Sequence, residues 1–367
     1  MNFPRLAKLP ILLVALMLNS VQGWADAWQQ TVAARVSTEY DSNPALSPTY
    51  PEGIWRTIFE PSYTLMGMLG KNELKTGLAL QIARSSNETL SQNREDPSAF
   101  LDWQRQSVAG EFGISTRYAE TATRIAELGN TGPGTVDSTR TSRTMAGRWN
   151  KALTDRSTLS ADGSYESNSY KGSTYIDYVT RSGSTMFSYA WSERSTPFIK
   201  MSYADYEPTG GGPSSRLYTA TLGLNWTTSD YLRGTLQAGR TKVNDAEMGT
   251  QGGASLQYTG QRTQLVLNAG REVSPSGLGG FTTVDQANGG WSYALSERSK
   301  TGIDLGWSKS HFVTDFINRT AGAWLQHDLN SFWLMRTYYM HRITEQGGVV
   351  ASSNLLGISF IYTHTDF

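Results

Sequence analysis

The stretch Leu74-Lys75-Thr76-Gly77-Leu78-Ala79-Leu80-Gln81-Ile82 alternates apolar side chains with polar or small ones. Successive residues of a strand point to opposite faces of a sheet, so this stretch has one apolar and one polar face. Similar segments of about ten residues recur from Val32 to Phe367. A membrane wall with lipid on one side and water on the other needs this pattern. The sequence therefore predicts an all-β fold, a transmembrane antiparallel β-barrel.

Short polar segments between the alternating stretches indicate where the chain reverses. Eight of them suit tight periplasmic turns: Gly70–Asn72, Ser107–Gly110, Thr154–Arg156, Ser192–Arg194, Thr228–Asp230, Thr259–Gln261, Ser296–Arg298 and Asp328–Asn330. Longer Gly-, Asn-, Pro- and Ser-rich stretches between them, such as Asp41–Gly53 and Ser85–Ser98, suit external loops. Eight turns and nine loops predict about eighteen strands, or about sixteen if one hairpin has been misread.

The N-terminus has the features of a secretory leader. Arg5 and Lys8 precede the apolar run Leu9–Leu18, and small residues follow at Gly23, Ala25 and Ala27. The run is shorter than the roughly 20 residues of a membrane helix. We predict a signal peptide at residues 1–25, cleaved between 23 and 27, and a single barrel domain over 26–367. Together with the strand pattern, this indicates the outer membrane of a Gram-negative bacterium, with outer-membrane lipid around the barrel.

Composition narrows the functional classes. The 32 Lys and Arg residues balance the 32 Asp and Glu residues, so charge gives no reason to expect a nucleic-acid partner. The count of 0 Cys excludes disulfides, thiolate metal sites and Cys nucleophiles. We expect no cofactor and no metal ion.

Catalysis is not indicated either. His311, His327, His341 and His364 all lie in the C-terminal part of the chain, outside any compact Ser-His-acid or His-x-x-x-His arrangement. We therefore predict that the protein is not an enzyme. The segment Asp41-Ser42-Asn43-Pro44 could offer oxygen ligands to a cation, but an Asx turn before proline explains it better.

Charged and amide side chains fall on the strand faces opposite the apolar ones. A barrel of about sixteen to eighteen strands encloses an aqueous lumen, so we expect these side chains to line water. Two interpretations stay open: a solvated wall with cross-strand ion pairs, or a polar ladder that passes a hydrophilic polymer or ion. The predicted lumen-lining residues are Arg35, Arg56, Glu60, Lys75, Gln81, Arg117, Arg148, Asp162, Glu166, Lys200, Arg233 and Asp304.

Several short motifs resemble one family. They are Glu39–Pro44, Trp103–Ser107 followed by Gly110–Gly113, and the turns Ala152–Arg156, Ala190–Arg194 and Ala294–Arg298. In these the chain resembles the β-barrel porin family associated with exopolysaccharide biosynthesis loci, which includes EpsL-like and exosortase-associated barrels. The resemblance implies that the barrel carries a secreted polysaccharide across the outer membrane, beside a periplasmic polysaccharide export protein. The terminal aromatic Phe367 is similar to the signal read by the barrel-assembly machinery, the partner expected during biogenesis.

Three functions remain open at this point. The chain could be a polysaccharide-export porin, a general or solute-selective diffusion porin, or a closed barrel with a structural or adhesive role. Fold analogy alone does not choose among them. Diffusion porins commonly carry a long, acidic, inward-folded loop, whereas the loop Ala126–Ser138 is short and Gly-rich. This difference favours export of something bulky.

Overall fold

The computed structural model describes residues 28–128, 138–172, 175–244, 247–311 and 315–365. The predicted leader at residues 1–25 and the terminal Phe367 lie outside these ranges. The regular secondary structure of the described chain is β-strand, apart from the one-turn helix α2 (Thr123–Ala126). Among the described residues, no helix is long and apolar enough to span a membrane.

The strands follow one another along the chain, separated by short connections. They are β1 (Trp28–Asp41), β2 (Ile54–Leu69), β3 (Asn72–Ser85), β4 (Arg94–Ser107), β5 (Gly110–Ala122), β6 (Thr139–Ala152), β7 (Ser157–Lys171), β8 (Tyr178–Tyr189), β9 (Ser195–Pro208), β10 (Ser215–Ser229), β11 (Leu232–Val243), β12 (Gly249–Thr259), β13 (Thr263–Pro275), β14 (Phe281–Ala294), β15 (Ser299–His311), β16 (Phe316–Asp328), β17 (Trp333–Gln346) and β18 (Val349–Thr365).

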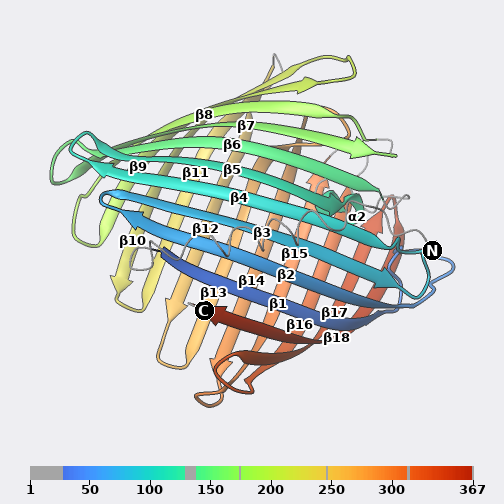
Figure 1. The fold of residues 1–367 in the computed structure, drawn as a ribbon. Helices are drawn as coiled ribbons and strands as arrows, with labels where there is room; N and C mark the ends of the chain where they lie inside the picture. The colour runs from blue at the N-terminus through green and yellow to red at the C-terminus, as the bar shows by residue number, and fades with distance from the viewer. Residues whose placement is uncertain (1–27, 129–137, 173–174, 245–246, 312–314, 366–367) are drawn as a thin grey trace.

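The strands form one closed 18-stranded sheet, as predicted (Figure 1). Each strand pairs antiparallel with the next, and β1 pairs with β18 from Thr31↔Thr365 to Asp41↔Leu355. Closure leaves no sheet edge with unpaired backbone groups, which a strand wall in lipid requires.

The two ends of the barrel differ. The chain reverses at all eight predicted turns at one end, the turn end, where Trp28 and Thr365 also lie. Gly110 reverses the chain there with a φ of +121°, a conformation that glycine adopts without strain. The other connections form the opposite end, the loop end.

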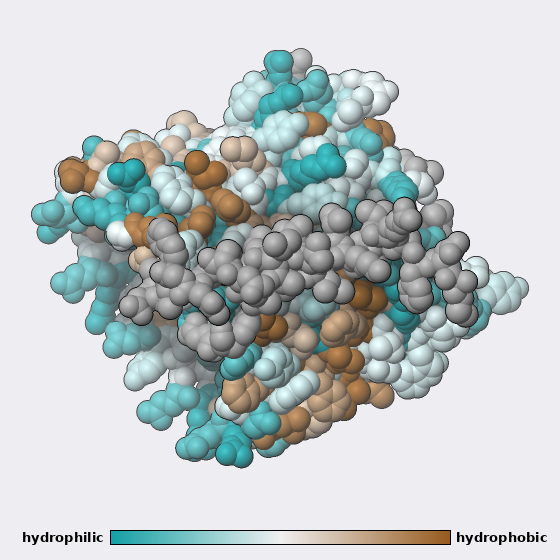
Figure 2. Space-filling model, in the orientation of Figure 1, coloured by the Kyte–Doolittle hydropathy of each residue, from teal (hydrophilic) through white to brown (hydrophobic). Residues whose placement is uncertain are grey.

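The strand register assigns each residue to one face of the wall, because directly paired residues point to the same side. Lys75 pairs with Asp102, and Arg148 pairs with Asp162. Leu222, whose surface is 65% exposed, lies on the opposite face from these charges. Figure 2 shows hydrophobic side chains over the strands and hydrophilic ones gathered at the left, the turn end. Exposed apolar residues of this outer face include Phe59, Leu101, Ile114, Met145, Phe187, Ile199, Leu222, Leu236, Ile303, Leu305 and Leu356.

Aromatic residues border the apolar band at both ends of the outer face. Near the loop end the rings of Tyr40 and Trp55 lie 5.2 Å apart, and those of Tyr203 and Tyr218 lie 5.1 Å apart, measured between centroids. Trp291 lies on the same face near the turn end. Such belts sit where membrane meets water, so the apolar band between them is the part in contact with lipid.

Several large aromatic residues depart from the apolar-out pattern, and four of them share one arrangement. Phe100, Phe198, Trp324 and Tyr338 lie on the inner face. Each pairs directly with a glycine of the neighbouring strand, and a Cβ on that glycine would collide with the ring. The glycines at positions 77, 223, 302 and 357 therefore make room for rings that lie flat on the inner wall.

Candidate functional site

The register brings all twelve residues that we predicted to line the lumen onto the inner face of the barrel. These residues are Arg35, Arg56, Glu60, Lys75, Gln81, Arg117, Arg148, Asp162, Glu166, Lys200, Arg233 and Asp304. They come from nine of the eighteen strands, so they form a distributed lining and no compact catalytic cluster.

Ion pairs hold most inner charges of β1 to β7. Arg56 Nη2 lies 2.5 Å from Glu39 Oε1, and that Glu39 carboxylate also accepts a hydrogen bond of 2.9 Å from the Tyr338 hydroxyl. Arg94 binds Asp96 through two nitrogens, at 2.8 and 2.9 Å. The other pairs on this wall are Arg35–Glu60 at 3.3 Å, Arg117–Asp102 at 3.4 Å, Arg140–Glu166 at 3.2 Å and Arg148–Glu111 at 3.4 Å.

The remaining predicted residues have weaker partners or none in the described part of the chain. Lys75 Nζ lies 6.0 Å from the Phe100 ring centroid, and Asp162 accepts a hydrogen bond of 2.6 Å from Ser184 Oγ. Arg233 donates to Gln257 Oε1 at 2.7 and 2.9 Å. Gln81, Lys200 and Asp304 make no side-chain hydrogen bond or ion pair with a described residue.

At the loop end, the segment that follows β5 turns inward and crosses the mouth of the barrel. Arg124 Nη1 donates to the carbonyl oxygens of Pro44 and Leu90, at 3.1 and 2.7 Å, in the first and second loops. Leu128 joins a buried apolar cluster with Leu46, Phe316 and Ala351. Phe316 begins β16, which six strands (β17, β18, β1, β2, β3 and β4) separate from β5. The first residues of this short, Gly-rich loop therefore narrow the mouth of the lumen.

Glu127 fixes the same segment to the near wall. Its side chain is 1% exposed, accepts a hydrogen bond of 2.6 Å from the Tyr170 hydroxyl, and lies 3.3 Å from Arg140 Nη1. Burial raises the pKa of the Glu127 carboxyl, while the Tyr170 hydrogen bond and the Arg140 charge oppose that shift. Arg124, Glu127 and Leu128 are called the crossing segment below. No periodic pattern in the sequence marks them, because they lie in or just after the one-turn helix α2, outside the alternating strands.

A second loop reaches the inner wall beside the crossing segment. The Tyr206 hydroxyl donates a hydrogen bond of 3.3 Å to the Ser276 carbonyl, in the loop between β13 and β14. The Tyr206 ring stacks on that of Tyr178 with 4.8 Å between centroids, and the two residues are 0% and 2% exposed. The loop end of the lumen is thus narrowed from several sides.

The histidines all lie on the outer face, away from the lumen. His327 Nδ1 is 2.8 Å from Ser299 Oγ, but no carboxylate of the described residues hydrogen-bonds this histidine. His311 lies between Asp285 and Asp315, at 3.0 and 3.1 Å, near the loop end. Among the described residues no group of three or more His, Cys, Asp or Glu side chains could hold a metal ion.

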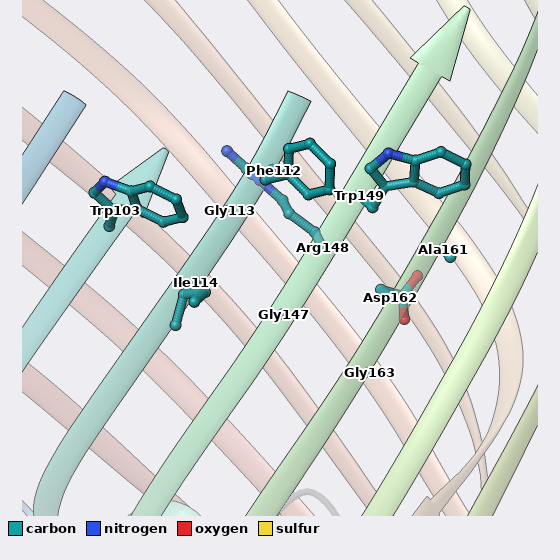
Figure 3. Close-up of a pocket in the computed structure, with 10 residues that line it drawn as sticks. All are labelled: Trp103, Phe112, Gly113, Ile114, Gly147, Arg148, Trp149, Ala161, Asp162 and Gly163. Atoms are coloured by element: carbon teal, nitrogen blue, oxygen red, sulfur yellow. The ribbon is translucent and has the colours of Figure 1, made fainter. Parts of the chain in front are cut away.

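A shallow pocket lies on the outer wall over β4 to β7. Figure 3 shows Trp103, Phe112, Ile114 and Trp149 around Gly147 and Gly163. Ile114 pairs with Gly147, which pairs with Gly163, so the floor of the pocket lacks side chains. Its apolar rim belongs to the lipid-facing surface, so we assign this hollow to membrane packing.

Comparison with known proteins identifies the fold. No protein family matches the sequence, and no curated protein is similar to it. Among solved structures, the outer membrane protein opdK from Pseudomonas aeruginosa is 8% identical, with 92% of this chain and 99% of that chain covered and a TM-score of 0.54. OccAB2 from Acinetobacter baumannii is 9% identical, with 94% and 99% covered and a TM-score of 0.53. OccK3 (OpdO) from Pseudomonas aeruginosa is 10% identical, with 96% and 100% covered and a TM-score of 0.52.

This likeness, together with the closed sheet and its apolar outer band, places the protein in the Gram-negative outer membrane. Membership of the exopolysaccharide-associated family remains a prediction, because no family matches.

Proposed function

We propose that the barrel is an outer-membrane channel that carries a secreted polysaccharide to the cell surface. The observation that supports this most is the pairing of inner charges along β1 to β7. A polymer must bind a channel wall weakly enough to leave it again. Six arginines of this wall each lie against a carboxylate, which reduces the charge that any one of them offers to a passing chain.

A polymer passes the loop end only when the crossing segment moves aside. The contacts that hold it include hydrogen bonds from Arg124 to two carbonyls, the contacts of Glu127, and the packing of Leu128. We propose that the arriving chain displaces this segment, with a periplasmic polysaccharide export protein delivering the polymer at the turn end.

A second candidate is a diffusion porin, and one observation favours it. A segment that folds into the mouth restricts passage to small solutes while it stays in place, as the contacts of Arg124 and Glu127 hold it. In that case the crossing segment sets the size limit of the pore and does not need to open.

Deleting the gene and restoring it intact separates the two candidates. Export predicts that the deletion strain loses surface polysaccharide and accumulates polymer in the periplasm, and that the intact gene restores both. Unchanged surface polysaccharide together with slower uptake of small solutes would support the diffusion porin.

A further inference from the structure

The inner face of β1 to β7, with its ion pairs, is called the charged wall below. The inner face of β10 to β14 differs from it. This second face carries only two charged side chains, Arg233 near the turn end and Glu272 near the loop end. Between them lie mostly amides, hydroxyls and glycines, with Val266 as an exposed apolar side chain. We call this inner face of β10 to β14 the amide wall. In the closed strand order β12 lies half-way round the sheet from β3, so the amide wall faces the charged wall across the lumen (Figure 1).

Some amides of this wall are engaged, as Gln251 is with Thr221, but three others are open to the lumen. Gln237, Asn268 and Asn288 are exposed, and none makes a side-chain hydrogen bond with a described residue. Each amide offers two N–H donors and one carbonyl acceptor. Polar groups on the charged wall, in contrast, mostly bind one another. The amide wall therefore holds unused hydrogen-bonding capacity without charge.

The register places two of these amides, Asn268 and Asn288, in a continuous row with two hydroxyls, of which that of Thr235 already donates to Asn225 Oδ1 at 2.7 Å. Thr235 pairs with Ser255, Ser255 with Asn268, and Asn268 with Asn288. Strands lie about 4.8 Å apart, so the row presents a hydrogen-bonding side chain at each such step. Because barrel strands tilt by about 40° from the axis, the row climbs along the wall and does not simply encircle it.

Glycines beside the row leave space for a ligand. Gly253 pairs with both Gln237 and Gly270. Lacking side chains, these positions expose a broad strip of wall on which a flat ring can rest. The strip alone would be unspecific, but the open amides around it select groups that both donate and accept hydrogen bonds.

From this arrangement we propose that the amide wall binds a neutral, polyhydroxylated chain, and that the exported polysaccharide runs along it. This inference rests on the proposed export function. Sugar hydroxyls donate and accept hydrogen bonds and so match Asn and Gln side chains. An acidic chain finds only Arg233 as a cation on this wall, and Arg233 already donates to Gln257. A wall for an acidic polymer would need cations along its length.

Current block in planar bilayers tests the proposal with the purified full-length barrel. The probes are maltohexaose, which is neutral, and hexagalacturonate, which is acidic and equally long. We expect maltohexaose to block at a concentration at least about tenfold lower. The double variant Asn268→Leu, Asn288→Leu should shorten the block by maltohexaose about fivefold or more and leave the open-channel conductance unchanged.

A matched control comes from the charged wall. Gln81 and Gln104 are inner-face amides on β3 and β4, so Gln81→Leu, Gln104→Leu removes as many amides from the opposite side. This control should leave block times unchanged. If the asparagine double variant does not fold, Gln237→Met provides a near-isosteric loss of one amide. If the barrel conducts no ions, equilibrium dialysis should show that it binds maltohexaose more tightly than hexagalacturonate.

Equal or stronger binding of hexagalacturonate, or equal effects of the two double variants, would overturn the proposal. Its failure is separable from failure of the export function. If the deletion strain keeps its surface polysaccharide but the barrel prefers maltohexaose, the amide wall stands and export fails. If the deletion abolishes export but the barrel shows no such preference, export stands and the amide wall fails.

Discussion

Replacing Leu222 with arginine tests the assignment of the two faces most sharply. Leu222 is seven residues from Ser215 and seven from Ser229, the ends of β10, and is 65% exposed on the outer face. At about 3.3 Å per residue and a tilt of about 40°, seven residues correspond to roughly 18 Å along the membrane normal. An arginine side chain at this position cannot reach water at either end of the band.

No carboxylate compensates the new charge. The outer neighbours of Leu222 on adjacent strands are Ile199 and Ala238, and the outer carboxylate of Asp205 lies opposite Arg216 near the loop end. A lipid-facing arginine at the midplane costs about 2 to 4 kcal/mol, which corresponds to a loss of about 30- to 1,000-fold in the folding equilibrium.

Gln237→Arg is the matched control, because Gln237 is exposed on the inner face of the neighbouring strand β11. Its cost should stay within about 0.5 kcal/mol, as for other solvated positions. Thr221 faces inward too, but it is 4% exposed and accepts a hydrogen bond of 2.9 Å from Gln251, so an arginine there would not fit.

Urea unfolding in lipid vesicles, followed by the heat-modifiable gel shift of the folded barrel, measures both variants against the unchanged chain. We expect the midpoint to fall strongly for Leu222→Arg and little for Gln237→Arg. Equal losses for the two variants would refute the face assignment.

Two further predictions concern the crossing segment and the wall charges. Because burial raises the pKa of Glu127 above its ordinary 4.5, the inward position binds a proton more tightly than an open one. The inward position of the crossing segment should be most stable below about pH 4.5 and lose stability as the pH rises through the raised pKa. The conductance of the barrel should therefore fall on acidification, and Glu127→Gln should abolish this fall. An unchanged fall in the variant would exclude Glu127 as its cause. Neutralising Arg56, Lys75, Arg148 and Arg233 together should shift the ion selectivity toward cations, because Glu39 and Glu111 lose their partners. The shift should shrink near 1 M salt, where the screening length falls to about 3 Å. An unchanged reversal potential would contradict this prediction.

The sequence was sufficient to predict the wall of the barrel. Segments such as Leu74–Ile82 show their two faces by alternation alone, and polar turns such as Ser192–Arg194 mark the reversals. Both signals are local in sequence, which is why the strand number and the facing of Lys75 could be read without coordinates.

The loop-end closure could not be predicted, because it depends on contacts between distant segments. Leu46, Leu128, Phe316 and Ala351 come from four separate parts of the chain, and only the closed barrel brings them together. The inner position of rings such as Trp324 also escaped prediction. The pairing of Trp324 with Gly302 depends on the register between β15 and β16, and alternation within one strand does not determine that register.

The central claim, that a polysaccharide passes through this lumen, is tested most directly by labelling an introduced cysteine during secretion. The chain has 0 Cys, so Gln237→Cys on the amide wall gives a single reporter. Asp155→Cys, exposed in the turn between β6 and β7, is the control outside the lumen. In cells switched between secreting and non-secreting states, we expect secretion to slow maleimide labelling of Gln237→Cys several-fold and to leave Asp155→Cys unchanged. Equal labelling of Gln237→Cys in both states, in cells that deliver normal surface polysaccharide, would contradict the claim.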